Sequence, residues 1–378
     1  MAALNEEQTL LQEQARSWSL NEAPVKAFRK MRDGGDELAF DADTWKSIAE
    51  LGWTGILVPE AYGGAGMGYL SMGIVLEELG RQLTASPLLA SGLVGATGLM
   101  LAGTDAQKQA WLPKIADGSA IVTLAADEGP RHTPKRTAVT AKKSAGGYAL
   151  DGVKSHVLEG MAADALIVSA RTSGQPGDAA GVSLFLVEGD AKGVTRTRLR
   201  TADSRGYASV TLSGVEVAQD ALLGKLDAGG EVLQTILDRG RAGLAAEMLG
   251  TAAQAFDMTV EYLKTRVQFG QVIGSFQALG HRAAIMFTQT ELTRSCTEGA
   301  LQAIDDDSDD VALLCSLAKC KVGALSHLVT NELIQIHGGI GMTDEFDAGF
   351  YLKRARAQEA TWGNQAFHRD RYASLSGI

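Results

Sequence analysis

Positive charge is scarce in this sequence. The 378 residues include 35 Lys and Arg against 45 Asp and Glu, which gives a formal net charge of -10 at pH 7. Clustered Lys and Arg supply most of the affinity for nucleic-acid phosphates and for anionic lipid surfaces. We therefore expect neither a nucleic-acid nor a membrane partner, and an anionic ligand would need a local basic site.

Cysteine is also scarce. Cys296, Cys315 and Cys320 are odd in number and show no C-x-x-C spacing, so they do not describe a disulfide framework. The acidic run Asp305–Asp310 lacks the spaced ligands and the glycine of an EF-hand, so we expect no metal site there. No basic segment followed by an apolar run opens the sequence, and we expect a cytoplasmic protein.

Long apolar runs and proline are the remaining deficits. The most apolar stretch, Pro87–Gly103, falls short of the roughly 20 residues of a membrane span and is interrupted by Gly, Ser and Thr. It predicts a buried core helix. Only 7 Pro stand against 44 Gly, which favours tight turns and close helix contacts.

Two helical regions flank a β region. Residues up to about Asp117 read as helical, and a four-residue spacing returns after Gly229, as in Leu244, Met248 and Phe256. Between them, turn residues separate four short β-leaning runs: Tyr148–Leu150, Ala165–Val168, Ser183–Val187 and Ala208–Leu212. We expect an α+β fold with an N-terminal α-helical domain (1–118), a middle antiparallel β-sandwich or barrel (119–226) and a C-terminal helical bundle (227–378).

Motifs in both helical regions resemble those of the acyl-CoA dehydrogenase family. They are Leu51–Trp53, Val58–Glu60, Tyr62–Gly64, Leu76–Gly80, Tyr262–Gly270, Ile273–Gln277 and Gln335–Gly341. The resemblance covers roughly residues 5 to 375 and is least faithful in the β region. It implies a C-terminal four-helix bundle, FAD as cofactor, an acyl-CoA substrate and electron-transfer flavoprotein as electron acceptor.

The same resemblance implies where FAD would bind. In the family, positions matching Arg266, Phe269, Gln335, Gly338 and Gly339 hold the adenosine and pyrophosphate of a neighbouring subunit's flavin. Such a site needs cationic or N–H donors that approach closely, which an arginine and paired glycines supply. Alternatively, Arg266 is a charge at a helix C-terminus and the glycines form a turn.

The flavin-ring side departs from the family pattern. Where relatives carry Thr-Glu-Pro, the segment Ala126–His132 keeps only Glu128. The places of an aromatic ring and a hydroxyl that face the flavin are held by His156 and Leu158. Leucine donates no hydrogen bond, and His156 is alternatively an exposed or strand-end histidine.

Neither family position for the catalytic glutamate holds an acid. Trp362 stands at one position and Gly240 at the other, and both substitutions remove a proton acceptor. Asp238 and Glu359 are candidates for a relocated base. Either would reach the substrate from a different helical face, because two residues turn the direction by about 200°.

Asp238 and Arg241 match positions that contact CoA in relatives, so they are candidate substrate-binding residues. Alternatively, they form an i,i+3 pair on a helix surface.

Together, these features suggest an oxidoreductase subunit of lipid or steroid catabolism that lends half a flavin site to a second acyl-CoA dehydrogenase-like subunit, as in heterotetrameric relatives. Three alternatives remain open: an independent homo-oligomeric dehydrogenase with a relocated base, a flavin-dependent monooxygenase, and a binding protein without flavin.

Overall fold

The computed structural model describes residues 4–378, which divide into two compact units. Unit 1 holds residues 4–29, Tyr69–Thr84 and Arg241–Ile378, and unit 2 holds Lys30–Gly68 and Ala85–Gly240. Each unit is therefore assembled from segments that are far apart in the sequence.

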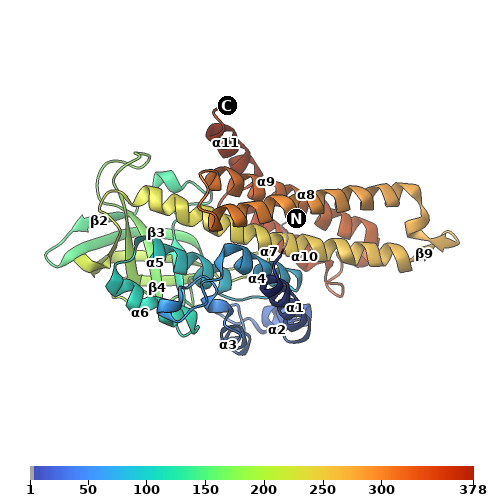
Figure 1. Ribbon diagram of the computed structural model, residues 1–378, viewed down its shortest axis with the longest axis horizontal. Helices are drawn as coiled ribbons and strands as arrows, with labels where there is room; N and C mark the ends of the chain where they lie inside the picture. Colours follow the sequence, from blue (N-terminus) through green and yellow to red (C-terminus); the bar gives the residue numbers. More distant parts are fainter. Residues whose placement is uncertain (1–3) are drawn as a thin grey trace. The chain divides into compact units, whose positions relative to one another are not determined.

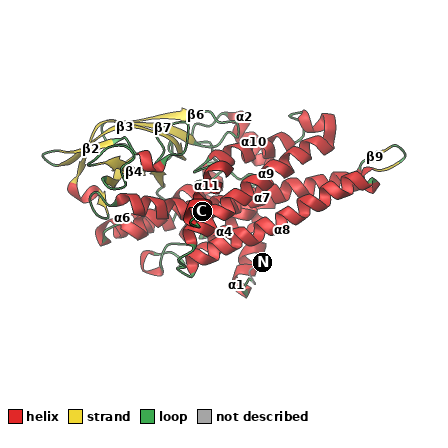
Figure 2. Ribbon diagram, turned by 90° about the horizontal axis from the view of Figure 1, so that it is seen from above, coloured by secondary structure: helices red, strands yellow, loops and turns green. Residues whose placement is uncertain are grey.

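Unit 1 is helical. Its elements are α1 (Glu6–Asn21), most of α4 (Gly68–Arg81), the greater part of α7 (Gly229–Thr265), α8 (Gln277–Asp305), α9 (Val311–His337), α10 (Ala348–Ala360) and α11 (Gln365–Leu375), with α2 (Val25–Gly34) shared with unit 2. Helix α9 packs against α8, α10 and α11. Figures 1 and 2 show α7, α8 and α9 running side by side. A hairpin of β9 (Val267–Gln268) and β10 (Gln271–Val272) separates α7 from α8.

Two glycines let α4 cross α7 at close range. A Cβ at Gly80 would lie 2.1 Å from the carbonyl oxygen of Glu247, and one at Gly250 would lie 1.8 Å from that of Glu77. Real Cβ atoms do not approach backbone this closely, so both positions require glycine. The close helix contacts expected from the glycine content are present here.

The segment Val311–Met342, which contains α9, is long and apolar enough to cross a membrane by length and composition alone. It packs against three helices of the unit and carries the buried Lys319. We interpret α9 as the central helix of the bundle. The acidic run before it contributes a cap, because Asp305 accepts hydrogen bonds from the backbone N–H groups of Tyr69 and Leu70 at the start of α4.

Unit 2 combines short helices with a sheet. Its helices are α3 (Ala42–Glu50), the π-helical segment η3 (Leu88–Gly95), α5 (Ala96–Ala102) and α6 (Asp105–Ala116). Its strands are β1 (Val122–Ala125), β2 (Thr140–Lys143), β3 (Gly147–Leu158), β4 (Ala165–Arg171), β5 (Val182–Glu188), β6 (Val194–Leu199), β7 (Tyr207–Ala218) and β8 (Leu222–Leu223). The four predicted β runs all lie within strands, and the apolar stretch Pro87–Gly103 is mostly helical and is buried as far as Leu99, as expected for a core helix.

The strands follow the order β6-β7-β3-β2-β4-β5-β8, and β1 joins at β4. Figure 2 labels β6, β7, β3 and β2, which follow one another in this order. Most pairs are antiparallel, but β1 and β2 each pair with β4 in parallel, a departure from the antiparallel sheet that the sequence predicts. Phe185 and Tyr148, with ring centroids 5.1 Å apart, lie in the buried core of this sheet. The fold class predicted from the sequence, helical at both ends with a β region between, is confirmed.

Candidate functional site

Trp362 lies in the turn between α10 and α11. Its backbone is in the left-handed region, with φ of 54°, and its side chain is only 6% exposed. A bulky residue in such a conformation costs about 1–3 kcal/mol and persists only where its surroundings hold it. The residues that hold this turn, which we call the Trp362 cluster, are Arg241, Lys319, Trp362, Gly363 and His368.

Lys319 fixes the turn through the backbone. Its Nζ donates to the carbonyl oxygens of Gln358, Glu359 and Gly363, each at 3.0 Å. Burial, together with the charge of Arg241, lowers the pKa of Lys319 to about 7. The hydrogen-bonding capacity of this amine is therefore spent on the chain's own backbone.

Arg241 and His368 meet at the carbonyl oxygen of Trp362. Arg241 Nε donates to it over 3.0 Å and His368 Nε2 over 3.1 Å. Burial, and then the charges of Arg241 and Lys319, hold the pKa of His368 well below its usual range, so the imidazole is neutral. Its proton is on Nε2, and buried Nδ1 has no hydrogen-bond partner among the described residues. The turn is rich in donors and presents no carboxylate at position 362.

The candidates for a relocated base are occupied or enclosed. Glu359 accepts a hydrogen bond from Gln365 Nε2 at 3.0 Å and lies 3.9 Å from Arg356 Nη1. Asp238 is 4% exposed and Arg241 is fully buried. Both side chains are therefore enclosed by the protein and not exposed on its surface.

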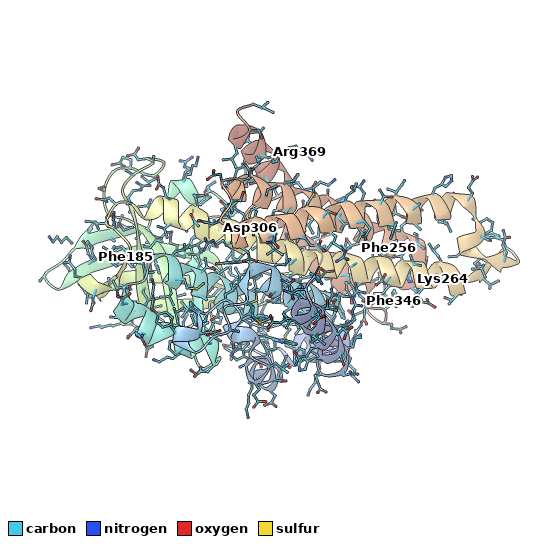
Figure 3. The ribbon with its side chains drawn as sticks, viewed as in Figure 1. Phe185, Phe256, Lys264, Asp306, Phe346 and Arg369 are labelled. Atoms are coloured by element: carbon cyan, nitrogen blue, oxygen red, sulfur yellow. The ribbon has the colours of Figure 1, made fainter. Side chains whose placement is uncertain are left out.

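A second group of residues gathers at one end of the unit 1 bundle. The rings of Tyr262 and His337 stack with centroids 4.1 Å apart, which brings the end of α7 beside the end of α9. Lys264, labelled in Figure 3, marks this end of α7. The predicted cofactor residues here, which we call the bundle-end cluster, are Arg266, Phe269, Gln335, Gly338 and Gly339.

The side chains of the bundle-end cluster are open to solvent. Phe269, at the tip of the β9–β10 hairpin, is 91% exposed and has a left-handed backbone. Arg266 and Gln335 are exposed, and their side chains have no hydrogen-bond or ion-pair partner among residues 4–378. A free guanidinium and a free amide are the donors that a pyrophosphate requires.

The two glycines also face open space. A Cβ at Gly338 or Gly339 would meet no atom within 4 Å. Gly338 needs glycine for its backbone, with φ of 63° and ψ of -134°. The chain's own packing gives no reason for Gly339, whereas close approach of a phosphate does. The bundle-end cluster therefore fits the pyrophosphate half of FAD.

The two clusters are far apart in unit 1. At 1.5 Å per residue, Lys319 and Gln335 lie roughly 24 Å apart along α9. Arg241 and Arg266 are separated by roughly 38 Å along α7. The bundle-end cluster and Trp362 therefore face different places on the molecule.

On the predicted flavin-ring side, in unit 2, Glu128 serves the fold. Its carboxylate lies 2.6 Å from Nζ of the buried Lys154 and accepts the backbone N–H groups of Ala138 and Val139. Lys154 Nζ also donates to Ser169 Oγ at 2.9 Å. Glu128 thus ties the segment before β2 to strand β3.

His156 and Leu158 lie in β3. His156 is exposed, with φ of 53°, at a bulge where β3 slips against β7, and its Nδ1 lies 2.8 Å from Ser155 Oγ. Leu158 is 5% exposed. The exposed position expected for His156 is confirmed, although it lies within the strand rather than at its end. Neither side chain supplies the hydroxyl that the family pattern implies at this site.

The sequence interpretation missed several buried charges. Lys154 and Lys319 anchor the segments described above, and Glu159 pairs with Arg205 at 3.0 Å inside unit 2. Lys319 could have been identified from the sequence, because it interrupts the apolar run of α9 and a lysine is rarely buried without a partner. The three cysteines are free. Among residues 4–378, no group of three or more His, Cys, Asp or Glu side chains is placed to hold a metal ion.

Comparison with known proteins bears on each region of the chain. The profile described as "Acyl-CoA dehydrogenase, N-terminal domain" matches residues 5–119, the middle-domain profile matches 126–217 and the C-terminal-domain profile matches 227–375.

Individual relatives match over nearly the whole chain. Acryloyl-CoA reductase (NADH) of Anaerotignum propionicum is 28% identical over 97% of this chain and 93% of its own length. The probable acyl-CoA dehydrogenase YngJ of Bacillus subtilis is 30% identical over 97% of both chains.

Solved structures are also similar to nearly the whole chain. Butyryl-CoA dehydrogenase from Megasphaera elsdenii superposes with a TM-score of 0.93 at 25% identity, covering 100% of both chains. A chain of the ChsE4-ChsE5 complex from Mycobacterium tuberculosis gives a TM-score of 0.89 at 27% identity, covering 99% of this chain and 98% of that chain. The chain therefore belongs to the acyl-CoA dehydrogenase family of FAD-dependent oxidoreductases.

Proposed function

We propose that this chain is a subunit of an FAD-dependent acyl-CoA dehydrogenase that lacks its own catalytic base and completes the FAD site of a catalytic partner. The observation that carries the proposal is that Trp362 stands where the family carries its catalytic acid. A buried, strained tryptophan occupies the family base position, and Arg241, Lys319 and His368 hold its turn in place. Gly240 removes the acid from the other base position.

FAD, when bound, accepts the hydride that leaves the β-carbon of an acyl-CoA while a base removes the α-proton. Under the proposal, the partner subunit supplies that base. This chain supplies Arg266 and the backbone at Gly338 and Gly339 to the pyrophosphate. Trp362 fills volume where an active subunit would hold an acyl chain, a packing role suited to a large aromatic side chain.

The wider assignments are part of the same proposal. A chain from the ChsE4-ChsE5 complex resembles this chain along its whole length, which supports a heteromeric assembly such as a heterotetramer. We further propose an acyl-CoA substrate, including a fatty or steroid side chain, electron-transfer flavoprotein as electron acceptor, and a cytoplasmic location.

Co-expression with an adjacent acyl-CoA dehydrogenase-like reading frame tests the proposal. We expect a complex with one FAD for each pair of chains, and bleaching of its flavin absorbance by an acyl-CoA. Inactivating the partner's base should abolish that bleaching, whereas Trp362→Phe in this chain should leave it. A complex with FAD in both chains would contradict the proposal.

The variant Trp362→Glu distinguishes the proposed subunit role from that of an independent dehydrogenase. The variant places a carboxylate at the base position, beside Arg241 and Lys319. We expect no acyl-CoA oxidation by the isolated variant, because His156 and Leu158 do not supply the flavin-ring contacts. Near-native circular dichroism would establish that it folds. Activity in the isolated variant would show that the chain's own flavin site is competent.

A further inference from the structure

The sheet of unit 2 opens beside β2. Strand β2 pairs with β4 only at Thr140 and Arg171, and then continues to Lys143 with β3 alone as its partner. A cleft of about 730 Å³ lies where the strands part, between β2 and the loop that follows β4. In Figure 1 this region is at the left edge of the sheet, around the label β2. Openings at the ends of β-barrels and curled sheets are common sites for small ligands.

The cleft is positively charged in an acidic protein. Lys142, Lys143 and Arg171 line it, and none of its described lining residues is acidic. The chain as a whole carries a formal charge of -10. Both lysines are exposed, and neither has an ion-pair or hydrogen-bond partner among residues 4–378. Their ammonium groups are therefore available to an anion.

Arg171 lines the cleft and fixes the loop that forms one of its walls. It is 5% exposed, and its guanidinium donates to the carbonyl oxygens of Thr137 at 2.9 Å, Ala180 at 2.9 Å and Ser173 at 3.3 Å. These bonds hold the loop after β4 in one conformation before a ligand arrives. Within the described residues no carboxylate pairs with Arg171, so its charge adds to that of the cleft.

Further bonds close the same loop. The carboxylate of Asp227 accepts the hydroxyls of Thr172 at 2.6 Å and Ser173 at 2.8 Å, and Asp178 accepts the backbone N–H of Gln175 at 2.8 Å. These two acids face the loop's own donors. A preformed wall lowers the entropy that binding would otherwise cost.

The rest of the lining is apolar. Ala141 and Tyr148 belong to the buried core of the sheet, and Leu226, which is 45% exposed, lies at the cleft with Pro176. A ligand that fits both parts has an anionic group for the lysines and an apolar body for these walls.

We propose that this cleft binds a phosphate-bearing small molecule with an apolar or planar body, such as a nucleotide. Lysine ammonium groups are compact point charges that suit a phosphate. The guanidinium of Arg171 is occupied by carbonyl groups, so it adds its charge to the cleft without offering a free bidentate fork. The site is separate from the bundle-end cluster, since all of its residues belong to unit 2.

Calorimetric titration of the full chain with adenosine diphosphate and with inorganic pyrophosphate tests the proposal, and the Arg266→Ala variant shows whether the bundle-end cluster contributes to the binding. We expect both probes to bind, adenosine diphosphate more tightly because of the apolar walls, and both to weaken as sodium chloride is raised. Acyl-CoA that competes with adenosine diphosphate would identify the CoA nucleotide as the ligand, and absence of competition would identify a free nucleotide.

The variant Lys142→Gln with Lys143→Gln should weaken adenosine diphosphate binding by roughly 10-fold or more, because the loss of a single charge-assisted hydrogen bond already accounts for about a tenfold change. The matched control, Lys135→Gln with Arg136→Gln, removes two exposed charges just before β2 that do not line the cleft. It should bind as the native chain does, and so should Arg266→Ala. Failure of the native chain to bind, or equal binding by the Lys142 and Lys143 variant, would overturn the proposal.

Discussion

The two clusters of unit 1 use similar residues in opposite ways. In the Trp362 cluster, Arg241 and Lys319 direct their donors at the chain's own carbonyl oxygens, and the whole group is buried. In the bundle-end cluster, Arg266 and Gln335 are exposed and have no side-chain partner among the described residues. The donors of the first cluster bond the chain's own backbone, and among the described residues only the acceptor His368 Nδ1 in this cluster is left without a partner. The second cluster has donors without partners among the described residues, as expected of a surface that binds another molecule.

This difference indicates which of the two clusters can bind another molecule. A buried turn whose donors bond the chain's own carbonyl oxygens stabilises the fold, and it presents no carboxylate at position 362. An open group with a guanidinium and two uncovered glycines can receive a phosphate. The following changes test whether the clusters are as separate as their contacts indicate.

Lys319→Met should have the largest effect. It leaves three carbonyl groups in or near the buried turn without their donor, and we expect the free energy of unfolding to fall by about 3 kcal/mol or more. Urea denaturation followed by circular dichroism measures this. The control Lys321→Met changes a less buried lysine on the same helix. Equal stability of the Lys319→Met variant and the native chain would mean that the turn does not depend on this amine.

Arg266→Ala should act on the cofactor and leave stability nearly unchanged. The loss of a charge-assisted hydrogen bond to pyrophosphate should weaken FAD retention in the complex by roughly 10- to 100-fold. Equilibrium dialysis of FAD measures the change. Lys264→Ala, which removes a charge from the last turn of α7, is the control and should retain FAD. Unchanged retention in Arg266→Ala would remove the bundle-end cluster from the cofactor site.

The stability contributed by Lys319 should depend on pH. Its pKa is about 7 in the folded chain and near the ordinary 10.5 when unfolded, so the unfolded chain binds more protons between these values. The free energy of unfolding of the native chain should therefore rise, relative to Lys319→Met, by about 1 kcal/mol per unit from pH 7.5 to 9.5. The contribution is lost as pH falls toward 7. Parallel pH profiles of the two proteins would contradict this.

Gly339→Ala should have the smallest effect on the isolated chain. The added Cβ meets no atom within 4 Å, so we expect a change in unfolding free energy below about 1 kcal/mol. In the complex, the same Cβ should weaken FAD retention severalfold by displacing the phosphate. Gly341→Ala gives the opposite pattern, because its Cβ would lie 2.8 Å from the carbonyl oxygen of Ile334. A loss of stability in Gly339→Ala without any change in FAD retention would contradict this prediction.

Periodicity and motifs predicted the fold class and the order of its regions. The spacing of Leu244, Met248 and Phe256 lies in α7, and the run Ser183–Val187 lies in β5. Such patterns reflect burial of one face of a helix or strand, which a sequence displays directly. The parallel pairing of β1 with β4 was not predicted, since it joins strands that are distant in the sequence.

The candidate site was predicted only in part. The residues of the bundle-end cluster form motifs, so the sequence identified them as candidates, and the structure places them at one end of unit 1. The partners of Lys319 are backbone carbonyl groups, which carry no sequence signal. The burial of Asp238 and Arg241 likewise depends on tertiary packing and not on their spacing along α7.

FAD binding by this chain purified alone tests the central claim most directly. If the bundle-end cluster serves a partner's flavin and positions 156 and 158 do not support the chain's own, the isolated chain should purify colourless and retain no FAD after gel filtration with excess cofactor. The complex should retain it. Stoichiometric FAD in the isolated chain would contradict the account.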